Sequence, residues 1–217
     1  MIVTIDGPAG AGKSTSAREL AQRLSFQFLD TGAMYRAVTW YCLKQKIDLE
    51  NEPAVAAAAR RAAFEFKGGQ VFVDEVEVTR EIRRSAVTDQ TKFIAGNNLV
   101  RKQLVELQRK LAAGTDVVTE GRDQGTVAFP HAECKFYLTA SPLSRARRRQ
   151  HDLAANGEDV ALEVILAQQE SRDQRDANRE FGALKPAPDA VSIDTSDLTF
   201  DDVVSRMEAI VRRKFAK

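Results

Sequence analysis

The chain has 217 residues, of which 32 are lysine or arginine and 31 are aspartate or glutamate, so its formal net charge is +1. This balance argues against a protein that binds nucleic acid or a membrane surface through overall positive charge. The length corresponds to one or two domains, and no apolar stretch is long enough to span a membrane. Cys42 and Cys134 lie far apart without metal-binding spacing, so we expect no disulfide and a cytoplasmic location.

The first expected element is a short apolar strand at residues 2–5, which leads into a glycine-rich segment with the spacing of a phosphate-binding P-loop. In such a loop backbone N–H groups contact phosphate oxygens, Lys13 reaches the β- and γ-phosphates, and the Ser14 hydroxyl binds Mg²⁺. A helix at 14–24 is expected next, with its N-terminus directed at the phosphates. We therefore predict that ATP and Mg²⁺ bind to Gly7, Pro8, Ala9, Gly10, Ala11, Gly12, Lys13, Ser14 and Thr15, with Ser14 as the metal ligand.

Four more strands are expected at 26–29, 117–119, 135–138 and 191–193, and helical patterns separate most of them. Alternating strands and helices indicate an α/β fold, here a five-stranded parallel sheet covered by helices. Ligands bind beyond the carboxyl ends of the strands in such sheets. Unusual polar segments follow the second, third and fourth strands, at 30–36, 120–123 and 139–142, where a ligand is expected.

One stretch interrupts the alternation. Residues 64–66, 71–73 and 76–78 have the pattern of short antiparallel strands joined by tight turns. We expect residues 37–112 to form a substrate-binding insert in a core made of 1–36 and 113–217, and a surface hairpin without function is the alternative. A helix is expected at 97–112, ended by Gly114, with Arg101 displaced from an apolar face of Leu99, Val100, Leu104, Leu107 and Leu111.

Arginines cluster on two later helical segments. On a helix, Arg145, Arg148 and Arg149 lie within about one turn of one another, and Arg172, Arg175 and Arg179 follow one another at intervals of about one turn. Asn156-Gly157 would turn the first helix back against the second. These arginines could belong to an ion-paired surface, but beside a P-loop they favour a phosphoryl-transfer lid at about 145–180.

Five segments together resemble the bacterial-type cytidylate kinase family over nearly the whole chain. They are the P-loop, Asp30-Thr31-Gly32-Ala33-Met34-Tyr35-Arg36, Glu120-Gly121-Arg122-Asp123-Gln124-Gly125-Thr126-Val127, Arg145-Ala146-Arg147-Arg148 and Arg172-Asp173-Gln174-Arg175-Asp176. The resemblance implies a P-loop kinase core with a monophosphate-binding insert and a short helical lid. It also implies transfer of the γ-phosphoryl group of ATP to CMP or dCMP, with small-molecule nucleotides as the only partners, and we expect a monomer.

The resemblance also assigns site residues. It implies that the acceptor phosphate binds Tyr35, Arg36, Arg122 and Arg179, that the ribose binds Arg172 and Asp176, and that the base binds Arg101 and Asp123, with Thr31 in the same site. Arg148 matches a lid arginine near the donor phosphates, so the expected catalytic residues are Lys13, Arg122, Arg148 and Arg179.

Two positions depart from the family pattern. Asn98 stands where a proline usually precedes the helix, which costs little because asparagine can cap a helix. Lys92 stands where a serine usually helps to read the base. An ammonium group only donates hydrogen bonds, so Lys92 could serve an oxygen of uracil as well as of cytosine, and weaker base selectivity is our hypothesis.

The expected mechanism needs no general base, because the acceptor phosphate is itself largely dianionic at neutral pH. Two other classes stay open. A P-loop kinase for a hydroxyl acceptor would need a carboxylate base, for which Asp30 or Asp123 is available. A nucleotide-dependent switch or a nucleic-acid-dependent ATPase is the other class, although the balanced charge weakens the latter.

Overall fold

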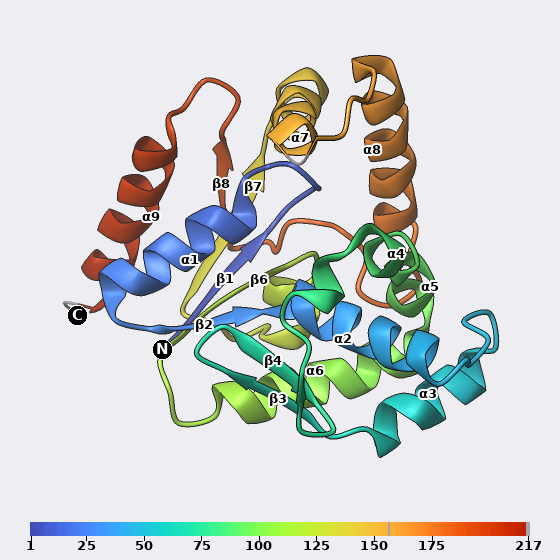
Figure 1. Ribbon diagram of the computed structural model, residues 1–217. Helices are drawn as coiled ribbons and strands as arrows, with labels where there is room; N and C mark the ends of the chain where they lie inside the picture. The colour runs from blue at the N-terminus through green and yellow to red at the C-terminus, as the bar shows by residue number, and fades with distance from the viewer. Residues whose placement is uncertain (156, 216–217) are drawn as a thin grey trace. The chain divides into compact units, whose positions relative to one another are not determined.

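A computed structural model describes residues 1–155 and 157–215 and divides the chain into two compact units (Figure 1). The core unit consists of Met1–Leu29 and Gly114–Lys217, and the insert unit consists of Asp30–Ala113. No helix in the described ranges is both long enough and apolar enough to cross a membrane.

The core unit contains a five-stranded parallel sheet, as predicted. Its strands are β1 (Ile2–Asp6), β2 (Gln27–Asp30), β6 (Val117–Gly121), β7 (Cys134–Thr139) and β8 (Val191–Asp194). The order is β2-β6-β1-β7-β8, and β1 pairs in parallel with both β6 and β7. Because β1 is the central strand, the loop that follows it starts at the middle of the sheet edge.

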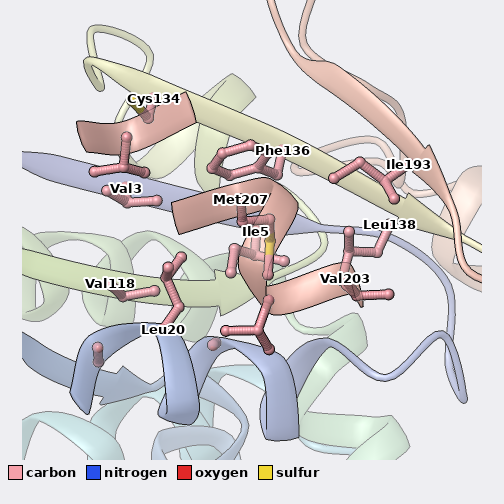
Figure 2. Packing of buried hydrophobic residues seen from close by; sticks show 14 of the residues in the cluster. Val3, Ile5, Leu20, Val118, Cys134, Phe136, Leu138, Ile193, Val203 and Met207 are labelled. Carbon is pink, nitrogen blue, oxygen red and sulfur yellow. The ribbon is translucent and has the colours of Figure 1, made fainter. Parts of the chain in front are cut away.

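Two helices pack on one face of this sheet: α1 (Lys13–Leu24) and α9 (Phe200–Phe215). Leu20 of α1 and Met207 of α9 are fully buried against Ile5 of β1 and Phe136 of β7 (Figure 2). Cys134 belongs to the same cluster. Both Cys134 and Cys42 are buried free thiols, and no disulfide was predicted for them. This core holds β1 and α1, and therefore the loop between them, in a fixed geometry.

The predicted arginine-bearing hairpin consists of α7 (Pro142–Ala155) and α8 (Leu162–Ala177), which share an apolar cluster that includes Ala146 and Ile165. Gly157 has the positive φ of 81° that a sharp turn requires, whereas Asn156 lies outside the described residues. One prediction was wrong: Arg179 does not extend α8, because the helix ends at Ala177.

The insert unit combines a small sheet with helices. Its antiparallel strands β3 (Phe64–Lys67), β4 (Gln70–Val73) and β5 (Val76–Glu77) confirm the predicted short strands. The helices are α2 (Thr31–Lys44), α3 (Glu52–Arg61), α4 (Ser85–Thr88), α5 (Thr91–Gly96), α6 (Asn98–Ala112) and a short 3-10 helix, Glu81–Arg83.

Helix α6 has the predicted length, but its buried face differs from the expected one. Asn97 caps the helix by accepting from the backbone N–H groups of Leu99 and Val100, and Gly114 beyond its end has a positive φ of 74°. Leu99 is 44% exposed, whereas Arg101, expected off the apolar face, is only 2% exposed. Arg101 is buried because its guanidinium donates to the carbonyl oxygen of Ala95 at 3.2 Å.

Candidate active site

The P-loop joins β1 to α1, and its glycines take conformations that other residues rarely adopt. Gly7, Gly10 and Gly12 have φ values of 145°, 77° and 82°, and Gly12 caps α1. A Cβ atom on Gly7 would lie 1.9 Å from the carbonyl oxygen of Leu138, so no larger residue fits there. The backbone therefore curls in front of the N-terminus of α1, an arrangement that binds anions through N–H groups.

Lys13 is buried within this loop. Its side chain is 5% exposed, and Nζ donates a 2.7 Å hydrogen bond to the carbonyl oxygen of Pro8. Burial, reinforced by the positive charge of Arg122, lowers the pKa of Lys13 to about 7. A phosphate group would counter both effects, so this ammonium is poised to gain from binding an anion.

Ser14 and Glu120 place two oxygen atoms next to the loop. Ser14 Oγ donates to Glu120 Oε1 at 3.0 Å, and Glu120 is 6% exposed. A hydroxyl and a carboxylate are the oxygen ligands that Mg²⁺ takes when nucleotide phosphates supply others. Within residues 1–155 and 157–215, no three carboxylate, imidazole or thiol side chains gather as a metal site. The residues thus fit a magnesium ion held partly by its nucleotide and not a fully protein-bound metal.

The turn after β6 carries Arg122 and Asp123 and is anchored to β1. The Asp6 carboxylate accepts from the backbone N–H groups of Gln124 at 2.8 Å and Gly125 at 2.7 Å. Burial raises the pKa of Asp6 to about 6, against the opposing effect of these two hydrogen bonds. Asp123 is 4% exposed and lies in the electrostatic range of Asp6, so a buried carboxylate on the turn lies near a second one at the end of β1.

Asp176 of α8 brings together two of the predicted phosphate-binding arginines. Arg122 Nε donates to its Oδ2 at 2.8 Å, and Arg179 donates to its Oδ1. Burial opposes ionisation, but Arg122, Arg179 and Arg172 together lower the pKa of Asp176. The result is a cluster of three arginines around one carboxylate, with a net positive charge that suits a phosphate group.

Two arginines of α7 lie next to the P-loop. Arg145, which was not assigned a site role, is 6% exposed and donates to the carbonyl oxygen of Ala9 at 3.0 Å and to Asp173. Arg148, expected near the donor phosphates, donates to Thr195 Oγ1 at 3.0 Å. It borders an open hollow beside the P-loop that is also lined by Gly12, Thr15, Thr195, Leu198 and Phe200.

The residues of this hollow that follow β8 were missed by sequence reasoning, and so was Arg145. Thr195 directly follows β8, so the rule that ligands bind at the carboxyl ends of strands could have identified it. Arg145 had no such signal, because its contact with Ala9 depends on how α7 packs against the loop.

Within the insert unit, Thr31, Tyr35 and Arg36 lie on the first two turns of α2. The Asp30 side chain caps this helix by accepting from the N–H of Ala33 at 2.7 Å, and it also pairs with Arg36 and Arg83, at 3.3 and 3.1 Å. Two guanidinium groups thus share one carboxylate at a helix N-terminus, which leaves net positive charge there.

Arg101 and Lys92, two of the residues expected to read the base, have different environments. The guanidinium of Arg101 lies 5.6 Å from the centroid of the Tyr35 ring, so two predicted substrate residues are in contact. Lys92 is exposed, with Nζ 5.1 Å from the centroid of the Phe93 ring. An exposed ammonium can reach a ligand only by leaving this ring.

Comparisons with known proteins agree with this geometry. The family model described as cytidylate kinase matches residues 3–213. The chain is 45% identical to the cytidylate kinase of Rhodopirellula baltica over 98% of its own length and 93% of that protein's. It is 47% identical to the cytidylate kinase of Desulforamulus reducens, covering 94% and 93% of the two chains.

Among solved structures, a gluconokinase from Sinorhizobium meliloti 1021 superposes with a TM-score of 0.50 at 15% identity. The superposition covers 97% of this chain and 91% of the gluconokinase, and at this identity it supports the P-loop kinase fold alone. The sequence matches carry the more specific conclusion: the chain belongs to the cytidylate kinase family.

Proposed function

We propose that this protein transfers the γ-phosphoryl group of ATP to the phosphate of CMP or dCMP, in a reaction that requires Mg²⁺. The observation that carries the proposal is the charge arrangement within the core unit. A P-loop with its lysine lies in the electrostatic range of Arg122 and Arg172, the arginines that surround Asp176. One unit therefore offers positive charge for a donor triphosphate and for a second phosphate group.

The mechanism consists of positioning and charge neutralisation. Lys13, Arg122 and Arg179 offset the repulsion between the two phosphate groups and stabilise the charge that spreads over the transferred group. The acceptor phosphate needs no deprotonation, so the buried carboxylates are free of the role of general base. Ser14, with Glu120 beside it, would hold the Mg²⁺, which would supply positive charge to the donor phosphates.

On the acceptor side, Arg122 and Arg179 are the proposed phosphate ligands of the core unit, Arg172 and Asp176 the ribose ligands, and Asp123 a base ligand. A carboxylate accepts from the exocyclic amine of cytosine, whereas uracil would present another acceptor to Asp123. From the insert unit, the proposed CMP ligands are Thr31, Tyr35, Arg36, Lys92 and Arg101. Arg36 and Arg101 are the guanidinium groups among them, suited to the phosphate and to the ring acceptors of the base.

On the donor side, the hollow beside Gly12 suits the nucleoside part of ATP. Leu198 and Phe200 give it apolar surface, and Arg148 and Thr195 give it polar groups. We therefore assign Arg148 to the nucleoside end of the donor, where a guanidinium can stack on a base. The catalytic role expected for Arg148 at the phosphates remains a prediction.

We also propose that the protein acts in the cytoplasm as a monomer. The buried free thiols of Cys42 and Cys134 suit a reducing compartment. Sedimentation of the purified protein would test the monomer, and a dimer at assay concentrations would contradict it.

The proposed reaction is tested by mixing the purified protein with ATP and Mg²⁺ and following ADP formation. The acceptors offered are CMP, dCMP, UMP, AMP and a panel of non-nucleotide alcohols. We expect CMP and dCMP to stimulate ADP formation most. Stimulation by an alcohol would favour a hydroxyl kinase with Asp30 or Asp123 as its base, and background hydrolysis in every mixture would favour a nucleotide-dependent switch.

A further inference from the structure

Asp6 is a buried, charged residue for which the proposed mechanism has no use. It is the last residue of β1, directly before Gly7 of the P-loop, and it is 3% exposed. Burial at this position raises its pKa to about 6, so an ionised Asp6 costs the folded protein stability at neutral pH. An acidic side chain kept at such a cost must do something that an apolar residue cannot.

The contacts of Asp6 indicate what that is. Each of its oxygens accepts one hydrogen bond from consecutive backbone N–H groups, Oδ1 from Gln124 at 2.8 Å and Oδ2 from Gly125 at 2.7 Å. Both groups follow Asp123 immediately and begin the π-type turn Gln124–Ala128. A carboxylate that accepts hydrogen bonds from two adjacent N–H groups fixes the peptide plane between them. It therefore also fixes the orientation of the residues just before them.

The turn is also held from its other side. Thr119 Oγ1 donates to Gln124 Oε1 at 2.8 Å, so the Gln124 side chain is tied to β6 while its backbone is tied to β1. Gly125 packs closely against β1, because a Cβ atom there would lie 3.0 Å from Thr4 Oγ1 and 3.4 Å from Asp6 Oδ2, so a side chain fits only if these neighbours move by a few tenths of an ångström. The turn that carries Arg122 and Asp123 is thus held against β1, the strand that leads into the P-loop.

We infer that Asp6 is a positioning residue for the acceptor nucleotide, which holds Arg122 and Asp123 in the orientation that binds CMP. This inference rests on the proposed function, because it takes Arg122 and Asp123 as CMP ligands. Through Asp6, β1 positions both the P-loop, which binds the donor, and the turn with Arg122 and Asp123, which binds the acceptor. The two phosphates then meet in one geometry, as efficient phosphoryl transfer requires.

Two variants test the inference. Asp6→Asn keeps the size of the side chain but turns one acceptor into an N–H donor that faces a backbone N–H. Gly125→Ala crowds the same turn against Thr4 and Asp6 of β1 without changing any charge, so the field at Lys13 stays as it is. Asp189→Asn is the control. It removes an exposed carboxylate in the same unit, which accepts a hydrogen bond of 2.9 Å from Lys135.

The measurement is the dissociation constant of CMP and of ATP by titration calorimetry for wild type and each variant. We expect the CMP constant to rise at least ~10-fold in Asp6→Asn and ~5-fold in Gly125→Ala, with the ATP constant within ~3-fold and Asp189→Asn like wild type. If Asp6→Asn does not fold, Gly125→Ala alone decides.

Three results would overturn the inference. Unchanged CMP affinity in both variants would show that Asp6 does not position the acceptor ligands. Equal losses of CMP and ATP affinity in Gly125→Ala would make the contact a general folding element. Wild-type protein that does not bind CMP would overturn the proposed function as well, which distinguishes that failure from the first two.

Discussion

Arg122 and Asp176 are joined by a hydrogen bond of 2.8 Å from Nε to Oδ2, although one follows β6 and the other lies on α8. Arg179 binds the other oxygen of the same carboxylate. Asp176 therefore keeps two guanidinium groups together that would otherwise repel each other. Each guanidinium has five N–H donors, so the pairing with Asp176 uses only part of the hydrogen-bonding capacity of each arginine. This pairing is the basis of the first two predictions.

Arg122→Ala should reduce kcat with CMP by at least ~100-fold, because it removes the charge that we propose contacts the reacting phosphate. ATP affinity should hardly change, because the loss of one positive charge is offset at Lys13. Arg122 lowers the pKa of Lys13, so its removal leaves the lysine more fully protonated. Steady-state kinetics and ATP titration check both parts, with Arg175→Ala, an exposed arginine on α8, as the control. A matching loss of ATP affinity would place Arg122 on the donor side.

Asp176→Asn should lower the free energy of unfolding by about 3 kcal/mol at pH 7, because it leaves two partly buried guanidinium groups around a neutral amide. The pKa of Asp176 is lowered in the folded protein, so its stabilisation is present above the unfolded value and is lost as the pH falls through the folded one. The difference from wild type should be constant between about pH 5 and 8 and shrink below about pH 4.

Urea unfolding at several pH values measures this difference, and Glu170→Gln, an exposed position on α8, is the control. A difference that grows on acidification would contradict the role of Asp176 as an ionised partner.

Nucleotide binding should take up a proton at pH 8. Lys13 has a pKa of about 7 in the free protein because burial and Arg122 disfavour its charge, whereas bound phosphates favour it. At pH 8 ATP itself is fully ionised, so the proton uptake reports on the lysine. Calorimetry in two buffers of different ionisation enthalpy measures the uptake. Lys13→Arg should abolish it, since a guanidinium stays protonated at this pH. Binding without proton uptake in wild type would show that Lys13 is already charged.

Lys92→Ser should raise the ratio of kcat/KM for CMP to that for UMP, because a serine can donate and accept hydrogen bonds whereas an ammonium only donates. A several-fold rise is expected, comparable with the ~1 kcal/mol of one hydrogen bond. Competition between the two nucleotides in one assay gives the ratio directly. An unchanged ratio would show that Lys92 does not read the base. Its ammonium would then only lie over the Phe93 ring, exposed to solvent.

The fold could be predicted from the sequence because its signals are local. Apolar strand residues such as Val3 and Ile5 stand next to turn residues, and Ala17 and Leu20 recur at helical spacing, so the strands and α1 follow from the pattern alone. The end of α8 was harder to predict, because the segment from Arg172 to Arg179 contains no proline or glycine to stop the helix.

The parts of the site that escaped prediction depend on contacts between distant segments. Arg101 was expected at the base, but its burial was not expected, because its partners, the Ala95 carbonyl and the Tyr35 ring, come from the preceding turn and from α2. Arg145 belongs to the predicted lid cluster and Asp6 carries no signal beyond its charge, and only the packed structure shows what each one holds. The P-loop was the exception, since its function lies in its own backbone.

The product of the reaction reveals the nature of the acceptor most directly. ³¹P NMR of the protein with ATP, Mg²⁺ and CMP should show two mutually coupled signals of a new diphosphate, CDP, growing as ADP forms. A new phosphomonoester signal, or inorganic phosphate alone, would contradict phosphoryl transfer to a nucleoside monophosphate.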